Sequence, residues 1–101
     1  MYVRTTSATF RSGTTDEALR IFRDVMLPHA QIQPGFRGAL VVRRPGSEQG
    51  VMMTFWTTEA DLRASSPPPE IAPQLARLDD LIQHATQDIY EVVLHTLSSE
   101  G

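Results

Sequence analysis

The sequence lacks three residue types that many functional sites need. Cysteine is absent from all 101 residues, which excludes disulfide bonds, thiolate metal sites and cysteine nucleophiles. Lysine and asparagine are absent as well, so all nine basic residues are arginines. The net charge of −3 gives no electrostatic support for a nucleic-acid partner. The three histidines lie far apart without metal-ligand spacing, so we expect no bound metal.

Long hydrophobic runs are also missing. The longest nearly uninterrupted apolar stretch is only a few residues long, too short for a membrane span. The first residues, Met1 to Ser7, contain no apolar signal-peptide core, and the cytoplasm is therefore the expected compartment. Hydrophobic residues make up 41% of the chain and charged residues 21%, as in an ordinary globular protein. We expect a single domain over residues 1–97 and a frayed tail at 98–101.

The spacing of apolar residues predicts the element order β-α-β-β-α-β. Strands are expected at 2–11, 38–44, 51–57 and 88–97, long helices at 14–32 and 71–85, and a short helix at 58–66. Pro28 should kink the first helix, because its ring clashes with the carbonyl group of Asp24. Three prolines at 67–69 should form an extended link. This order is that of a ferredoxin-like sandwich, an α+β fold with an antiparallel four-stranded sheet.

Several of the predicted strands are apolar on both faces. Two helices can cover only one face of a four-stranded sheet, so the other face needs a second cover. We predict a homodimer in which two sheets pack face to face into a barrel, with a monomer carrying scattered surface hydrophobic residues as the alternative. The two-sided pattern is formed by Ala39, Leu40, Val41 and Val42, and by Val51, Met52, Met53, Phe55 and Trp56.

Three features together resemble the antibiotic biosynthesis monooxygenase family of dimeric α+β barrels. The first is the end of the first helix, which runs into a Pro-Gly turn at 27–36. The second is the strand end Phe55-Trp56, followed by Thr57, Thr58 and a short acidic helix up to Leu62. The third is the element order itself. The resemblance covers the chain from Tyr2 to about Thr96.

The resemblance implies two kinds of chemistry. Some members are similar to cofactor-free oxygenases of quinols, anthrones and other polycyclic phenols, in which the deprotonated substrate itself passes an electron to dioxygen. Others degrade haem with an asparagine on the first strand, a tryptophan on the third and a histidine on the next helix. Trp56 could match that tryptophan, but the chain has no asparagine, and the segment after Trp56 carries serines and prolines rather than histidine. We therefore expect neither haem degradation nor a cofactor.

Trp56 and His29 are the first candidate site residues. Trp56 ends a strand, where it could stack on an aromatic substrate or simply pack in the core. His29 lies on or beside the apolar stripe of the first helix. Histidine exchanges protons near neutral pH and could act as a general base there, although such a residue often only satisfies the end of a helix. His84 and His95 are weaker candidates of the same kind.

Arg77 is the second candidate catalytic residue, because the resemblance implies an arginine from the last helix that stabilises a phenolate oxygen. The alternative is a solvated arginine paired with Asp79 or Asp80. Methionine adapts its shape to varied ligands. The residues expected to line a substrate pocket beside Trp56 are Phe22, Met26 and Met53.

The leading hypothesis is a cofactor-independent monooxygenase that acts on a small quinol, anthrone or polyketide-like aromatic compound with dioxygen. The alternative is a non-catalytic dimeric barrel that binds a small molecule or serves as an accessory protein. An isomerase or lyase on the same barrel would need a convergent acid and base. A lined internal cavity with Trp56 and a histidine would favour the enzyme, and a filled core would favour the structural role.

Overall fold

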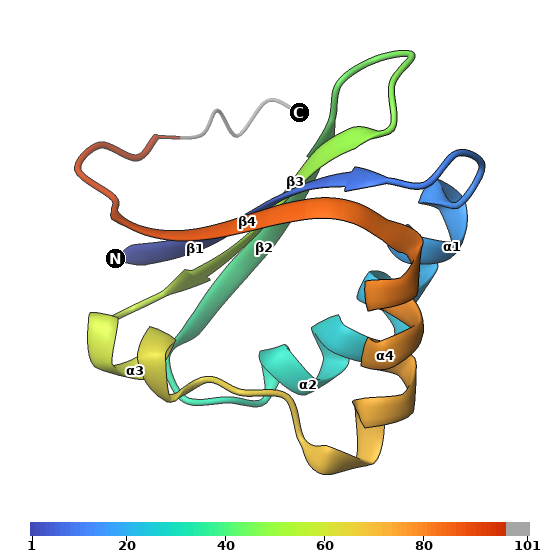
Figure 1. Ribbon diagram of the computed structural model, residues 1–101. Helices are drawn as coiled ribbons and strands as arrows, with labels where there is room; N and C mark the ends of the chain where they lie inside the picture. Colours follow the sequence, from blue (N-terminus) through green and yellow to red (C-terminus); the bar gives the residue numbers. More distant parts are fainter. Residues whose placement is uncertain (97–101) are drawn as a thin grey trace.

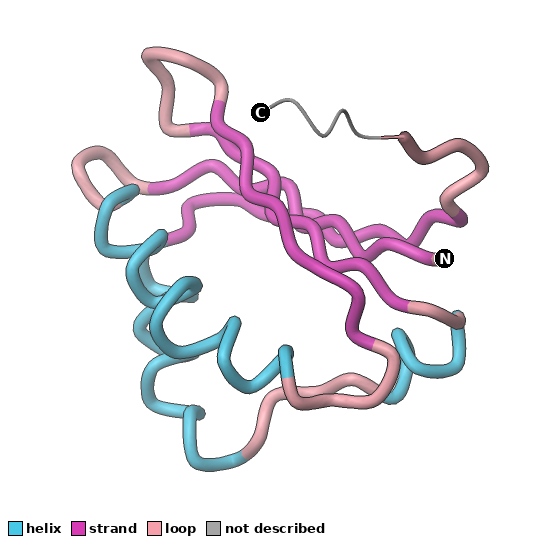
Figure 2. Tube along the Cα trace, turned by 180° about the vertical axis from the view of Figure 1, so that it is seen from behind, coloured by secondary structure: helices cyan, strands magenta, loops and turns pink. Residues whose placement is uncertain are grey.

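The computed structural model describes residues 1–96, and it confirms the predicted order and the α+β fold (Figure 1). The strands are β1 (Tyr2–Phe10), β2 (Phe36–Arg43), β3 (Gln49–Trp56) and β4 (Ile82–Glu91). The helical segments are α1 (Thr15–Ile21), η1 (Phe22–Met26), α2 (Leu27–Gln31), α3 (Glu59–Ala64), η2 (Pro69–Ile71) and α4 (Ala72–Leu81). The long helical segments lie on one side of the sheet (Figure 2). Among these residues no helix is long and apolar enough to cross a membrane.

The four-stranded sheet has the order β2-β3-β1-β4, and every neighbouring pair is antiparallel. The first strand is therefore central, and its residue Tyr2 pairs with Trp56 on one side and with Glu91 on the other. Side chains directly opposite one another share a face of the sheet. These registers fix which residues point toward the helices and which point away from them.

The kink predicted at Pro28 takes the form of an expanded helical turn, η1. The Leu27 N–H group donates to the carbonyl of Phe22, five residues earlier. A proline has no N–H group and its ring clashes with the preceding turn of an α-helix, and a wider turn before Pro28 relieves that crowding. Pro28 then lies in the first turn of α2, where the missing N–H group costs little.

The boundary between the last helix and the last strand differs from the prediction. The helix expected at 71–85 ends at Leu81, and the strand expected at 88–97 covers Ile82–Glu91. Pairing explains the shift, because β4 runs along the whole of β1 from Tyr2–Glu91 to Phe10–Ile82 and satisfies the second edge of that strand. Beyond β4, the Val92 N–H group donates to the carbonyl of Met1 at 2.8 Å. The expected tail at 98–101 lies outside the described residues.

The core is concentrated at one end of the molecule. Its cluster joins β1 to α1 and α4 through Ala8, Phe10, Ala18, Ile21, Leu78 and Leu81. At the other end of the sheet Trp56 and Leu62 are fully buried. The helix layer packs against the sheet through this cluster.

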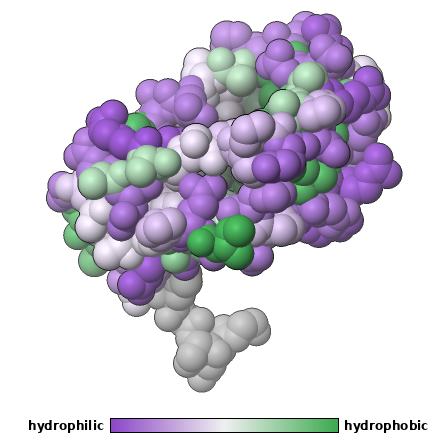
Figure 3. Space-filling model, turned by 90° about the horizontal axis from the view of Figure 1, so that it is seen from below, coloured by the Kyte–Doolittle hydropathy of each residue, from purple (hydrophilic) through white to green (hydrophobic). Residues whose placement is uncertain are grey.

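The face of the sheet away from the helices is apolar over β2 and β3, whereas β1 and β4 carry mainly polar residues there, such as Thr5, Ser7, Thr86 and Asp88. Leu40 is opposite Met53, and Val42 is opposite Val51, so all four side chains share this face. On this face, Leu40 of the edge strand β2 is 48% exposed, and Tyr90 of the opposite edge strand β4 is 55% exposed. We call the face of the sheet away from the helices the outer face. By contrast, the view from the helix side shows a largely hydrophilic surface (Figure 3).

Candidate active site

A cavity of about 360 Å³ lies between the sheet and the helix layer. This volume is within the range of sites that hold small organic molecules. Its walls come from β1, β3 and β4 on one side, from the segment 22–33 on the other, and from the α3–η2 connection and α4. The apolar part of the wall consists of Phe22, Met26, Leu27, Ala30, Met52, Pro67, Ile71, Leu78 and Ile82.

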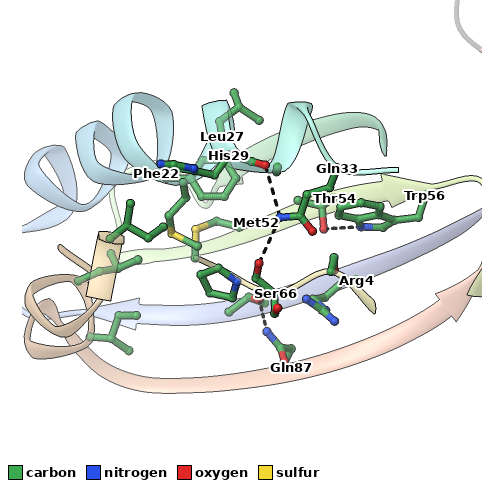
Figure 4. A pocket seen from close by; sticks show the side chains of 18 residues that line it. Arg4, Phe22, Leu27, His29, Gln33, Met52, Thr54, Trp56, Ser66 and Gln87 are labelled. Carbon is green, nitrogen blue, oxygen red and sulfur yellow. Dashed lines mark hydrogen bonds between the residues drawn. The ribbon is translucent and has the colours of Figure 1, made fainter. Parts of the chain in front are cut away.

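Trp56 forms one end of this cavity and is only 2% exposed (Figure 4). Its indole Nε1–H donates to the Thr54 hydroxyl oxygen at 3.0 Å. The ring of Phe36 meets it edge-on, with centroids 5.5 Å apart and planes at 82°, a favourable aromatic geometry. The indole is therefore held in one orientation by a polar and an aromatic contact. It packs in the core and lines the cavity at once, so the two roles considered for it do not exclude each other.

His29 reaches the cavity from α2, on the side opposite the sheet. The residue is half-buried. Its backbone carbonyl accepts a 3.4 Å hydrogen bond from the Gln33 side-chain amide, which also donates to the Ser66 carbonyl at 3.2 Å. These bonds tie α2 to the α3–η2 connection and hold the backbone of His29. Within residues 1–96, His29 makes a side-chain-mediated hydrogen bond only through its backbone carbonyl, and its imidazole ring has no protein partner.

Phe22 and Met26, both expected at a substrate site, also line the cavity. They are the first and last residues of η1. The expanded turn changes the angular spacing of side chains along the helix and thereby adjusts where these two residues point. Expanded turns of this kind occur often at functional sites.

The structure does not bring Arg77 and Met53 to the cavity. Arg77 instead forms a bidentate ion pair with the Glu17 carboxylate on the protein surface. Its Nε donates to one carboxylate oxygen at 2.7 Å and its Nη2 donates to the other at 2.9 Å. Glu17, and not the expected Asp79 or Asp80, is the ion-pair partner. Met53 lies on the outer face, because alternation along β3 puts it opposite to Met52 and Trp56. Of the two methionines that the sequence offered for the pocket wall, Met52 lines it and Met53 does not.

Arg4 is the lining residue that sequence reasoning missed. It points from β1 into the cavity, near Trp56 (Figure 4). Its Nη2 donates to the Leu62 carbonyl at 3.1 Å. Burial lowers the pKa of Arg4 from its ordinary value, and the positive charge of Arg63 lowers that pKa further. A signal was present in the sequence, because Arg4 alternates in phase with the apolar residues Ala8 and Phe10 of the first strand.

The other two histidines lie elsewhere. His84 borders a smaller hollow on the outer face together with Arg44 and Thr86. His95 is exposed beyond the end of β4. In the part of the chain that the structure describes, no group of three or more histidine, aspartate or glutamate side chains is arranged to hold a metal ion.

The sequence profile of the antibiotic biosynthesis monooxygenase family matches residues 1–71. The chain belongs to this family. A search of curated proteins found no match.

The solved structures of similar fold include two oxygenases and a haem-degrading protein. The cofactor-independent oxygenase SnoaB from Streptomyces nogalater superposes with a TM-score of 0.79 at 18% identity, over 93% of this chain and 94% of that one. The ActVA-Orf6 monooxygenase from Streptomyces coelicolor, solved with nanaomycin D, gives 0.77 at 14% identity over 97% and 92%. The haem degrader MhuD from Mycobacterium tuberculosis gives 0.73 at 22% identity over 95% and 99%. At these identities the likeness establishes the shared fold.

Proposed function

We propose that this family member is a cofactor-independent monooxygenase of a small aromatic compound such as a quinol, an anthrone or a related polyketide. The observation that carries the proposal is the cavity, which combines a fixed tryptophan, an imidazole without a protein partner and a mostly apolar wall. A filled core would have favoured a purely structural role. Family membership and the oxygenase neighbours support the same reaction class.

The proposed chemistry needs a base, a flat wall and a dry site. His29 takes a proton from the substrate, and the resulting anion gives one electron to dioxygen. The substrate radical and superoxide then combine into a peroxide, which loses water. For an anthrone, a CH₂ group becomes a carbonyl, one oxygen atom enters the product and the other leaves as water. The substrate supplies all the electrons that reduce dioxygen, so the reaction needs no external reductant.

Trp56 and the apolar wall act through binding. The rigidly held indole ring closes one end of the pocket and bounds the space open to a polycyclic substrate. Phe22, Met26 and Met52 enclose the rest of the ring system and exclude water, which would otherwise solvate the substrate anion. The sequence-based role of Arg77 is not part of this proposal, because that guanidinium is bound to Glu17.

The proposed assembly is a homodimer through the outer face. Leu40, Val42 and Tyr90 are exposed there, and Val51, Met53 and Phe55 continue the same apolar surface. A second copy would cover this surface with an equal surface of its own. The cytoplasm stays a prediction of the sequence.

Haem is not the substrate that these residues fit. The resemblance implies that haem-degrading members of the family use an asparagine and a histidine in addition to the tryptophan. The chain contains no asparagine, and α3, the helix that follows Trp56, carries no histidine. A haem titration followed by absorbance should give no tight Soret shift, and such a shift would contradict this assignment.

Oxygen uptake tests the proposed function. Protein dialysed against a chelator is mixed with a panel of anthrones and quinols in an oxygen electrode. The proposal expects uptake above the spontaneous rate for at least one compound, with one O₂ consumed per substrate. Binding without uptake would favour the non-catalytic small-molecule barrel, and neither binding nor uptake across the panel would contradict both.

A further inference from the structure

Arg4 is the one permanently charged side chain among the cavity residues of the described chain. It stands on the central strand, paired with Thr54 on one side and Ile89 on the other. Hydrogen-bonded neighbours on both sides fix the position of its backbone. The guanidinium is therefore held at the cavity by one of the two inner strands of the sheet.

The charge of Arg4 is not neutralised by the protein. Within residues 1–96, the three ion pairs involve Arg23, Arg63 and Arg77, and no carboxylate lies within ion-pair distance of Arg4. A partly buried cation without a counter-ion costs free energy. An unpaired charge that lines a cavity marks a candidate site for a ligand of opposite charge.

The one protein contact of the guanidinium does not account for its presence. The Leu62 carbonyl, which accepts from Arg4, already accepts from the Ser65 hydroxyl at 2.6 Å and from the Ser65 N–H group at 3.2 Å. The end of α3 is thus capped without Arg4. A guanidinium has five N–H donors in a planar fork, so most of them remain available to a ligand.

We propose that the cavity recognises an aromatic acid, with its carboxylate bound by Arg4 and its ring enclosed by the apolar wall of the cavity. The fork of a guanidinium matches the two oxygens of a carboxylate. One cation suits a single negative charge, and no second arginine lines the cavity in the described chain to neutralise a dianionic phosphate.

His29 contributes from the helix layer, whereas Arg4 contributes from the sheet (Figure 4). A substrate held by its carboxylate at Arg4 would present its opposite side to His29. The inference rests on the proposed use of the cavity as a ligand site. It does not depend on oxygen chemistry, because binding of the acid requires no turnover.

Calorimetry with 2-naphthoate and 2-naphthamide tests the inference. The two ligands share ring and size and differ in charge. Wild-type protein should bind the acid about tenfold or more tightly than the amide, since a charge-assisted hydrogen bond contributes more than a neutral one. That preference should weaken as salt is raised. Equal binding of the two ligands, or binding of neither, would overturn the inference without any variant.

Two variants of Arg4 test whether this residue causes the preference for the acid over the amide. Arg4→Gln should bind acid and amide equally, and Arg4→Lys should keep a reduced preference because it retains the charge but loses the fork. Arg23→Gln is the matched control, since it removes one arginine charge from an exposed pair with Asp24. An unchanged acid preference in folded Arg4→Gln, or an equal loss in the control, would overturn the assignment.

Oxygen uptake separates this inference from the proposed function. A preference for acids without any oxygen uptake supports the inference and contradicts the monooxygenase. Uptake with neutral and acidic anthrones at the same kcat/KM supports the monooxygenase and contradicts the inference.

Discussion

Trp56 donates its indole N–H to the Thr54 hydroxyl, two residues earlier on the same face of β3, at 3.0 Å. Both residues line the cavity. The bond satisfies the one polar atom of the indole. A fixed ring offers a ligand a prepared surface and loses little rotamer freedom on binding.

Thr54→Val removes this acceptor while keeping the shape of the side chain. The buried N–H group then lacks a partner, and the free energy of unfolding should fall by about 1–3 kcal/mol in urea denaturation. In the Trp56→Phe background the same change should cost much less, because no indole N–H group remains. Thr86→Val, at an exposed position of β4, should have little effect. An equal cost of Thr54→Val in both backgrounds would contradict the role given to this bond.

Gly35 allows the chain to turn from α2 into β2 beside α3. Its φ angle is +81°, and a Cβ atom there would overlap the side chain of Asp61. Its carbonyl accepts from the Thr57 N–H group at 2.8 Å. Gly35→Ala should therefore destabilise the protein through both strain and overlap.

Gly13 provides the matched comparison, because its φ is +77° and nothing lies within 4 Å of the added Cβ. Gly13→Ala should cost about 1–2 kcal/mol from the left-handed backbone alone, and Gly35→Ala should cost clearly more. Equal costs in urea denaturation would show that the Asp61 contact is unimportant.

Arg77 tests whether the last helix contributes to catalysis. Its hydrogen bonds lower the pKa of the Glu17 carboxyl group, so the unfolded chain takes up this proton before the folded protein does. The stabilisation is present near neutral pH and disappears as pH falls through the carboxyl range, below roughly 4.3. Arg77→Gln should lower stability slightly at pH 7 and not at strongly acidic pH, because the pair is solvent-exposed.

The same variant should keep wild-type oxygen uptake, since Arg77 is away from the cavity. Glu17→Gln provides the reciprocal test, as adding Arg77→Gln to it should no longer change the dependence of stability on pH. A large loss of kcat in Arg77→Gln would restore the role that the sequence suggested.

Leu40 tests the proposed dimer. Leu40→Glu places a charge in the apolar part of the outer face, on the edge strand β2, and should convert a dimer into a monomer in sedimentation velocity. Ile32→Glu is the control, because Ile32 is 81% exposed but lies after α2 rather than in the sheet. A monomeric wild type, or a Leu40→Glu variant that remains dimeric, would contradict an interface on this face.

The sequence predicted the parts of the fold that rest on local signals. Alternation gave β1 within one residue, and the hairpin of β2 and β3 follows from two apolar runs around a Pro-Gly loop. The end of α4 was missed because Ile82 and Ala85 continue the helical spacing. Their strand conformation comes from pairing with Phe10 and Ala8, more than 70 residues away in sequence.

The candidate site was predictable in part for a similar reason. Trp56 and His29 could be placed from one strand and one helix. The distinction between Met52 and Met53 was already present in their alternation with Trp56, and the inward phase of Arg4 was present in the first strand. The Arg77–Glu17 pair joins residues 60 apart, so it depends on how α1 and α4 pack and has no local signal.

The most direct test of the account compares the oxygen-uptake rates of His29→Ala and His84→Ala with the best substrate of the panel. His29 lines the cavity and His84 lies on the outer face, so the two variants remove the same side chain from different sides of the sheet. We expect His29→Ala to lose about 10²-fold or more in kcat, the usual contribution of a general base, and His84→Ala to keep the wild-type rate. Wild-type uptake by folded His29→Ala would contradict this role of His29.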